Sequence, residues 1–200
     1  MSLRNSPIRH RPVTMWVQGE QKEIVMLALA ISYEPKILRP RRLDQLMDQA
    51  IEAMYNEDYD RAEELLNEAN TQYPNRPIVL QNLGALYQRR DGDYERAIEM
   101  SRRAVEIDPE YVMGRCQLAL EAIVNQKDLE EAERWLSPIL DKDEIHITEF
   151  ELLCEAQVKL AHIRGRTEVA RGWFQFWHEL EPDSINLLRV RREVRTMRRL

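Results

Sequence analysis

The feature that most constrains the fold of this chain is a spacing that recurs about every 35 residues. Pro74 and Pro109 are 35 residues apart, and Pro182 follows after 73 more, close to twice that interval. Each proline ends the same skeleton, in which four positions are separated by four, three and five residues. The copies are Ala62, Leu66, Ala69 and Pro74; Ala97, Ser101, Ala104 and Pro109; and Ala170, Phe174, Trp177 and Pro182. A further copy, with Glu in place of proline, is Ala132, Leu136, Ile139 and Glu144. Such self-similarity indicates a repeat architecture.

Each repeat is predicted to form two helices joined by a tight turn. The first helix begins after the proline, as in RPIVLQNLGALYQRR (76–90), and the second follows as in GDYERAIEMSRRAVEID (92–108). Small residues at helical spacing on the second helix let two backbones approach closely, and the proline ends that helix. Because a lone helical hairpin cannot bury its apolar face, the repeats are expected to stack on one another.

The composition agrees with helices and shows an uneven charge. Charged residues make up 32% of the 200 residues, there are only 6 glycines, and the net charge is −6. Residues 1–42 carry eight Lys or Arg and three Asp or Glu, and residues 184–200 carry six Arg and one Glu. The chain is therefore an acidic body with two basic ends.

The repeat spacing, the NLGALY of residues 82–87 and the DYERAIE of residues 93–99 resemble the tetratricopeptide repeat family. The resemblance implies an all-α fold, a right-handed superhelical array of antiparallel helix pairs whose first helices line a concave groove. It also implies protein–protein binding without catalysis. We place the array at residues 43–183, with units at 43–76, 77–111, 112–144 and 145–183, and expect a basic amphipathic capping helix at 184–200.

The resemblance also implies which side chains line the groove that binds a partner. These groove positions are Met47, Ile51, Met54, Ile78, Gln81, Asn82, Ala85, Met113, Cys116, Leu120 and Ile123. The family includes a clamp for a partner's C-terminal carboxylate, which needs Lys, Arg and Asn at set positions. Only Asn82 matches this clamp, and without cations no charge-assisted grip on a carboxylate forms. We therefore expect an apolar groove that accepts a peptide or a helix.

Four aromatic residues crowd into the segment ARGWFQFWHELEPD (170–183), namely Trp173, Phe174, Phe176 and Trp177. Phe174 and Trp177 occupy skeleton positions, which predicts that they belong to the core. Trp173 and Phe176 lie on neighbouring faces, where we expect them to cover the end of the array together with the last helix. The alternative is an exposed aromatic docking site. The acidic helical surround disfavours a platform for stacking nucleotide bases.

The segment before the array is expected to be helical in part. The stretch EQKEIVMLALAISY (20–33) favours an apolar or amphipathic helix, and the linker that follows reaches the first unit. This N-terminal helical extension over residues 20–42 either caps the first unit or folds back into the groove. Residues 1–19 are basic and lack periodicity, which is typical of a flexible tail or of a strand-like arm that orders on contact.

No motif for catalysis, a metal or a cofactor is present in the sequence. The four histidines share no metal-ligand spacing, and a structural zinc site needs several converging ligands. The two cysteines, Cys116 and Cys154, fit a reducing compartment without a disulfide framework. The longest apolar run, IVMLALAI (24–31), is too short to span a bilayer. We therefore expect no cofactor, no enzyme activity and a cytoplasmic location.

Three functional hypotheses follow from the sequence. The first is an adaptor or scaffold that binds one protein partner through its groove. The second is a cytoplasmic chaperone that shields a hydrophobic client, as the small tetratricopeptide chaperones of type III secretion do. The third, disfavoured by the acidic body, is a nucleic-acid-associated factor that uses the two basic ends. The sequence leaves the oligomeric state open, a homodimer included.

Overall fold

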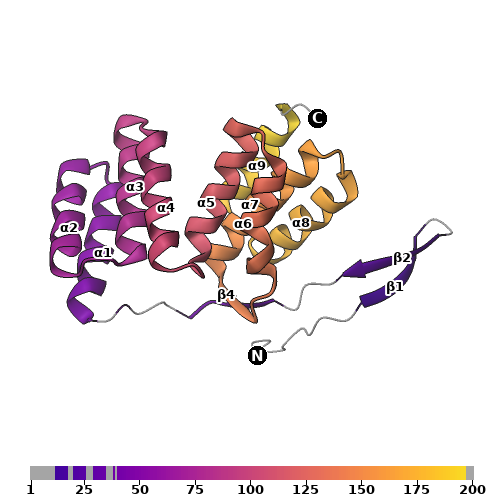
Figure 1. The fold of residues 1–200 in the computed structure, drawn as a ribbon, viewed down its shortest axis with the longest axis horizontal. Helices are drawn as coiled ribbons and strands as arrows, with labels where there is room; N and C mark the ends of the chain where they lie inside the picture. The colour runs from indigo at the N-terminus through magenta and orange to yellow at the C-terminus, as the bar shows by residue number, and fades with distance from the viewer. Residues whose placement is uncertain (1–11, 18–19, 26–28, 35–37, 39, 197–200) are drawn as a thin grey trace.

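A computed structural model describes residues 12–17, 20–25, 29–34, 38 and 40–196, and they form an array of antiparallel helix pairs (Figure 1). The first two pairs are α1 (Arg41–Tyr55) with α2 (Tyr59–Gln72), and α3 (Pro77–Asp91) with α4 (Tyr94–Ile107). In the third pair, α5 (Val112–Glu121) continues into a π-helix, η1 (Ala122–Gln126), before α6 (Leu129–Leu140). The fourth pair is α7 (Ile147–Ile163) with α8 (Thr167–Leu180), and α9 (Ile185–Thr196) follows. The predicted all-α repeat array is confirmed.

Three of the turns between the helices of a pair share one construction, which recurs every 35 residues. An aspartate caps the second helix, and its carboxylate accepts a hydrogen bond from the backbone N–H three residues later. These caps are Asp58, Asp93 and Asp128. The residue before each cap has a left-handed φ, at Glu57 (59°), Gly92 (66°) and Lys127 (56°). The turn is therefore set by backbone conformation and a cap together.

The small residues of the repeat skeleton lie where the two helices of a pair meet. Ala62, Ala69, Ala104 and Ala132 have no exposed surface. A Cβ added to Gly84 on α3 would lie 3.1 Å from the carbonyl oxygen of Ala97 on α4. Larger side chains at these positions would push the helices apart, so the spacing read from the sequence reports close helix contact.

The buried side chains form two hydrophobic cores. The first core lies within α1 to α4. The second lies within α5 to α9 and also takes in Leu29 and Ile145, which come from outside the helices. The array therefore has two halves, which meet where α4 turns into α5.

The segment before α1 contains strands, so the helix predicted over residues 20–33 is wrong for the described residues. Strand β1 (Pro12–Val17) pairs antiparallel with β2 (Glu20–Val25), and β3 (Ala30–Ser32) pairs in parallel with β4 (Glu144–His146), between α6 and α7. A short apolar run fits a strand as well as a helix, and a free strand edge decides between them. Here β4 offers that edge, and the N–H of Ala30 donates to the carbonyl oxygen of Asp143 at 2.8 Å.

The N-terminal segment reaches both halves of the array. Leu29 is only 3% exposed and lies in the second core, whereas Leu38 packs against the first core. The N–H of Leu38 donates to Oδ1 of Asp44 on α1 at 3.0 Å. In Figure 1 β3 lies along one edge of the array, beside β4. The segment thus connects the fourth helix pair to the first.

Parts of the predicted termini lie outside the described residues. For the predicted flexible tail at 1–19, this holds for residues 1–11 and 18–19, and the rest forms β1. For the predicted capping helix at 184–200, it holds for residues 197–200. The described part of that helix is α9.

We predict that Leu29→Ala lowers the free energy of unfolding by about 2 kcal/mol or more, because it removes a fully buried side chain from the second core. Tyr33→Ala, in the same segment but half-exposed, is the matched control and should cost less than about 1 kcal/mol. Urea unfolding followed by circular dichroism measures both values. Equal small losses for the two variants would contradict the docking of this segment.

Candidate protein-binding surface

The first helices of the first three pairs share a repeated surface pattern. A half-buried side chain is followed, one turn later, by an exposed one. The pattern is Ile51 and Tyr55 on α1, Ala85 and Arg89 on α3, and Leu120 on α5 with Val124 on η1. We call these six residues the first-helix face. Tyr55 is 73% exposed and Val124 is 46% exposed, so apolar groups of this face are open to a partner.

Tyr55 and Arg89 connect neighbouring helices across the first-helix face. The guanidinium carbon of Arg89 lies 5.5 Å from the centre of the Tyr55 ring. Such a cation–π contact is worth about 0.5–1 kcal/mol at an exposed site. It orients the tyrosine ring while leaving most of the ring exposed, so this side chain is positioned to contact a partner.

Not every groove position predicted from the sequence is open. Seven positions are partly exposed: Ile51, Ile78, Gln81, Asn82, Ala85, Met113 and Leu120. The other four, Met47, Met54, Cys116 and Ile123, are buried in the two cores. These four side chains therefore belong to the cores and are not open to a partner.

Val124 was missed because sequence spacing assigned the last groove position of the third unit to Ile123. In the structure Ile123 is buried and Val124 is exposed. The first unit shows the same offset by one residue, since Met54 is buried and Tyr55 is exposed.

Two neighbouring polar side chains on α3 differ in their hydrogen bonding. The Nδ2 group of Asn82 donates to the carbonyl oxygen of Ile78 at 2.8 Å, which turns this amide back onto its own helix. Oε1 of Gln81 is buried and accepts no hydrogen bond from the part of the chain that the structure describes. Leaving such an acceptor unpaired costs free energy that a bound donor could recover.

The N-terminal segment borders this surface at its lower edge. Leu38 lines a cavity of about 480 Å³ together with Leu43, Ile78 and Tyr111. The hydroxyl of Tyr111 is buried without a hydrogen-bond partner among the described residues. Burial, with Glu149 and Asp108 adding to it, raises the pKa of Tyr111 above its usual value. Leu38 therefore lies next to Ile78, a predicted groove position, and narrows the groove there.

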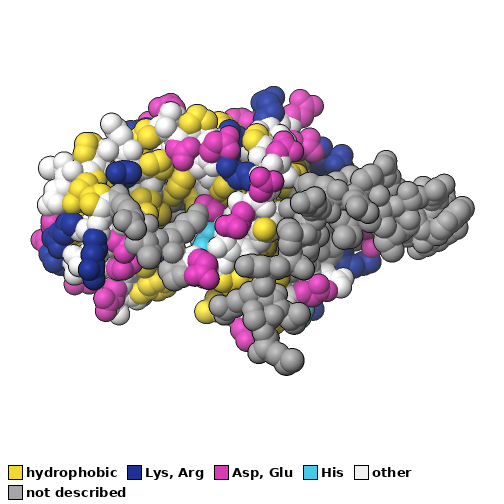
Figure 2. Space-filling view, turned by 90° about the horizontal axis from the view of Figure 1, so that it is seen from below, with side chains coloured by type: hydrophobic (Ala, Val, Ile, Leu, Met, Phe, Trp, Pro, Cys, Tyr) yellow, Lys and Arg dark blue, Asp and Glu magenta, His cyan; other side chains and the backbone are white. Residues whose placement is uncertain are grey.

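In Figure 2, viewed from below, hydrophobic side chains gather over the α1 to α4 half, with acidic side chains among them.

A ring of ion pairs closes the surface at the fourth helix pair. Glu155 and Lys159 on α7 are 7% and 8% exposed and pair with each other at 2.7 Å. Arg189 of α9 contacts Oε2 of Glu155 at 2.5 Å, and Glu193 of α9 contacts Nζ of Lys159 at 2.7 Å. Arg189 and Glu193 also pair at 2.8 Å, which completes the ring. Because α9 covers this side of α7, the open surface is confined to α1, α3 and α5.

The predicted aromatic cluster packs into the second core. Trp177 is fully buried, and its Nε1 donates to Oε1 of Glu151 at 3.3 Å. The ring of Phe176 meets that of Phe150 edge-on, with centroids 5.0 Å apart and planes at 77°. Trp173 and Phe174 are partly buried against the same core. The same carboxylate of Glu151 accepts from the hydroxyl of Ser184 at 2.5 Å, just before α9. The aromatics thus pack α8 into the second core, and Glu151 links Trp177 of α8 to the start of α9.

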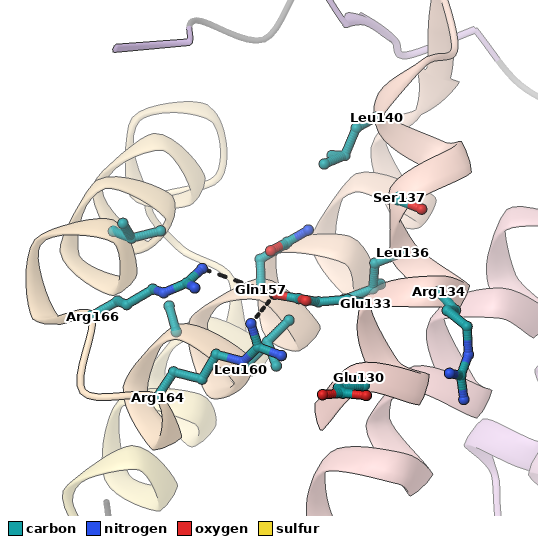
Figure 3. A pocket seen from close by; sticks show the side chains of 12 residues that line it. Glu130, Glu133, Arg134, Leu136, Ser137, Leu140, Gln157, Leu160, Arg164 and Arg166 are labelled. Atoms are coloured by element: carbon teal, nitrogen blue, oxygen red, sulfur yellow. Dashed lines mark hydrogen bonds and ion pairs between the residues drawn. The ribbon is translucent and has the colours of Figure 1, made fainter. Parts of the chain in front are cut away.

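A second cavity, which no sequence pattern predicted, lies between α6, α7 and the start of α8. Its volume is about 540 Å³, and leucines line it together with charged residues. Figure 3 shows Arg164 and Arg166 pointing toward Glu133 of α6; Arg164 forms an ion pair with it, and Arg166 lies 3.9 Å away. These three charges therefore pair with one another.

The side chains that could carry chemistry, two cysteines and a histidine, occupy structural positions. Cys116 and Cys154 are buried free thiols, and burial raises the pKa of both well above the usual value. The His146 ring caps α7 by accepting from the backbone N–H of Thr148, and the backbone N–H of His146 donates to Oε2 of Glu149 at 2.9 Å. Across the described residues, no group of three His, Cys, Asp or Glu could hold a metal ion. None of the helices described is both long and apolar enough to cross a membrane.

Comparison with known proteins supports the repeat through a family model and the fold through the structure of PilW. The family model for the tetratricopeptide repeat matches residues 78–111, which cover α3 from its second residue and all of α4. The crystal structure of PilW, a widely conserved type IV pilus biogenesis factor, is similar with a TM-score of 0.56 and 14% identity, over 76% of this chain and 70% of that chain. The Sgt2 tetratricopeptide domain from Aspergillus fumigatus has a TM-score of 0.42 and 20% identity, over 81% of this chain and 82% of that chain. No curated protein matches the chain.

We predict that the ring of ion pairs stabilises the protein above about pH 4.5 and weakens in acid. Burial would raise the pKa of Glu193, but hydrogen bonds from Lys159 and Arg189 outweigh it and hold this pKa below its usual value. Stability from a lowered pKa is present above the unfolded pKa and is lost as the pH falls through the folded one. Glu193→Gln should therefore destabilise the protein at pH 7, and the difference from wild type should shrink toward pH 3.

Urea unfolding at several pH values measures this difference. Glu168→Gln is the matched control, because Glu168 pairs with Arg171 on the exposed surface of α8. Such a pair contributes little at any pH. A constant effect of Glu193→Gln between pH 7 and pH 3 would show that the ring does not act through the charge of Glu193.

Proposed function

We propose that this chain, which has the fold of a tetratricopeptide repeat array, is a non-catalytic adaptor that binds a segment of one protein partner on its first-helix face. The observation that carries the proposal is the repeated pattern on three neighbouring first helices. The floor of this face is apolar and half-buried, and it consists of Ile51, Ala85 and Leu120. The exposed side chains beside the floor are Tyr55, Arg89 and Val124. A floor with exposed anchors is the arrangement by which a groove holds a helix or an extended peptide.

The chemistry of the face suits a mainly apolar partner segment. Met113 is partly exposed on α5, and its flexible thioether can adapt to differently shaped side chains. Tyr55 is a large exposed aromatic, a residue type that supplies much of the binding energy in protein interfaces. Arg89 next to it can pair with a carboxylate of the partner. The partner is therefore expected to place apolar residues over the floor and an acidic residue near Arg89.

The open length of the face limits the size of the segment. It extends over α1, α3 and α5, because α9 covers the corresponding side of α7. Helices packed side by side lie about 8–10 Å apart, so three helices offer a path of roughly 20 Å. This length fits a short peptide or about three turns of a helix. The proposed site is thus a small docking surface for one segment of a partner.

A chaperone for a hydrophobic client would use the same face. The partly exposed apolar floor, including Met113 and Leu120, favours keeping this second candidate. The two functions differ in the state of the partner. An adaptor's partner is soluble when expressed alone, whereas a client of a chaperone aggregates without this chain.

The test is affinity capture with matched variants that keep the fold. Tyr55→Glu combined with Val124→Glu places two charges on the first-helix face. Tyr94→Glu combined with Ile107→Glu places the same charges on α4, where these side chains are 58% and 39% exposed. We predict that binding of the captured partner, once purified, weakens at least about tenfold in the first variant, because it loses apolar anchors worth more than 1.4 kcal/mol.

The α4 variant should bind the partner as the wild type does, since its net charge changes equally but its face is different. Circular dichroism checks that both variants are folded. Equal losses in the two variants, or a partner unaffected by either, would refute binding on the first-helix face. Expression of the identified partner alone then separates the adaptor from the chaperone.

A further inference from the structure

The outer face of α9 is unlike that of a helix that only ends an array. Terminal repeat elements usually present polar residues to solvent. Here Ile185 is 82% exposed and Leu188 is 51% exposed, one turn apart on the same side of the helix. Leu187 and Val190 on the opposite side are buried in the second core. The inner apolar side of α9 therefore packs in the second core, whereas its outer apolar strip is exposed to solvent.

Arginines extend this strip along the helix. Arg192 and Arg195 continue the helical spacing of Ile185 and Leu188, and Arg191 lies at the edge. All three arginines are exposed, and none has a hydrogen-bond or ion-pair partner among residues 40–196 or the other described parts. Arg189, by contrast, is held by Glu155 and Glu193. The basic charge of the outer face is thus available for a partner.

The position of α9 is fixed by contacts on its inner side. The ring formed with Glu155 and Lys159 ties it to α7, and Ser184 ties its start to Glu151. The ring joins the buried Glu155 and Lys159 to Arg189 and Glu193, so it fixes which side of α9 faces α7. The outer face is consequently held in one orientation before any partner arrives, which reduces the entropy cost of binding.

We propose that Ile185, Leu188, Arg192 and Arg195 form a docking surface for an acidic amphipathic helix of a partner protein. Apolar residues of such a helix would cover Ile185 and Leu188, and carboxylates on its flank would pair with Arg192 and Arg195. The 12 residues of α9 span about 18 Å, which matches three turns of a partner helix.

Charge favours a partner helix over two other occupants of this surface, a second copy of the chain and an anionic membrane. A second copy of the chain would bring the same arginines face to face around a twofold axis, and like charges in contact are repelled. An anionic membrane is a flat surface and would also approach Glu179, Glu181 and Asp183, which precede α9 and carry negative charge. A helix is narrow enough to contact the basic strip alone.

This surface is separate from the first-helix face and does not depend on the function proposed for it. In Figure 1 α9 lies toward the end of the array opposite α1 and α2. Both sites could be occupied together, which would let the chain connect two proteins.

The test uses a fluorescein-labelled helical peptide of about 12–15 residues with leucines on one face and glutamates on its flanks. A peptide of the same composition with scrambled positions is the control. Fluorescence anisotropy with the full chain should show binding of the amphipathic peptide alone. Ile185→Ser with Leu188→Ser, and Arg192→Glu with Arg195→Glu, should each weaken it at least about tenfold. These side chains are exposed, so the variants should keep the circular dichroism spectrum of the wild type.

Tyr55→Glu with Val124→Glu should leave peptide binding unchanged, which separates this site from the first-helix face. Equal binding of both peptides, or loss in the Tyr55 and Val124 variant only, would overturn the proposal. Binding to phosphatidylserine-containing vesicles that is lost in the α9 variants, without peptide binding, would assign the face to membranes. Self-association seen by sedimentation, and lost in the same variants, would assign it to a second copy.

Discussion

The close approach of the two helices in each pair is the contact on which the rest of the array depends. Ala62, Ala104 and Ala132 have no exposed surface, and Gly84 leaves no room for a side chain against α4. Helices that pack so closely bury one side of each but leave apolar surface on the outside of the pair. That surface needs a neighbour, so the pair is stable only when it is repeated. Small residues therefore recur in the sequence because each helix pair of the stack needs this close contact.

A repeated stack must also end, and the way this one ends decides which surface remains for function. At one end α9 covers α7 with Leu187 and Val190, and the ring of Glu155, Lys159, Arg189 and Glu193 fixes it there. Along one edge the N-terminal segment inserts Leu29 into the second core. Among the first helices, α1, α3 and α5 keep an open face, where half-buried apolar residues lie beside exposed ones. The proposed first-helix face is therefore the part of the first helices that the terminal elements leave uncovered.

The sequence predicted what local spacing determines and missed what distant contacts determine. The helix pairs, their proline ends and the buried state of Trp177 followed from spacing alone. The strand at Ala30–Ser32 could not be foreseen, because its partner strand, Glu144–His146, lies far along the chain. The covering of Glu155 and Lys159 by α9 was not predicted for the same reason. For the predicted groove, spacing placed the candidate positions on α1, α3 and α5. It could not separate the partly exposed Ile51 from the buried Met47, since burial depends on packing against helices elsewhere in the chain.

The central claim is that a protein partner contacts the open face of α1, α3 and α5. Methionine methyl groups offer probes that need no mutation, since Met113 is partly exposed on α5 whereas Met100 is buried on α4. Methyl NMR of the chain labelled at methionine, recorded with and without the purified partner, tests the claim directly. Our account predicts that the Met113 signal shifts or broadens while the Met100 signal changes little. An unchanged Met113 signal under saturating partner would contradict it.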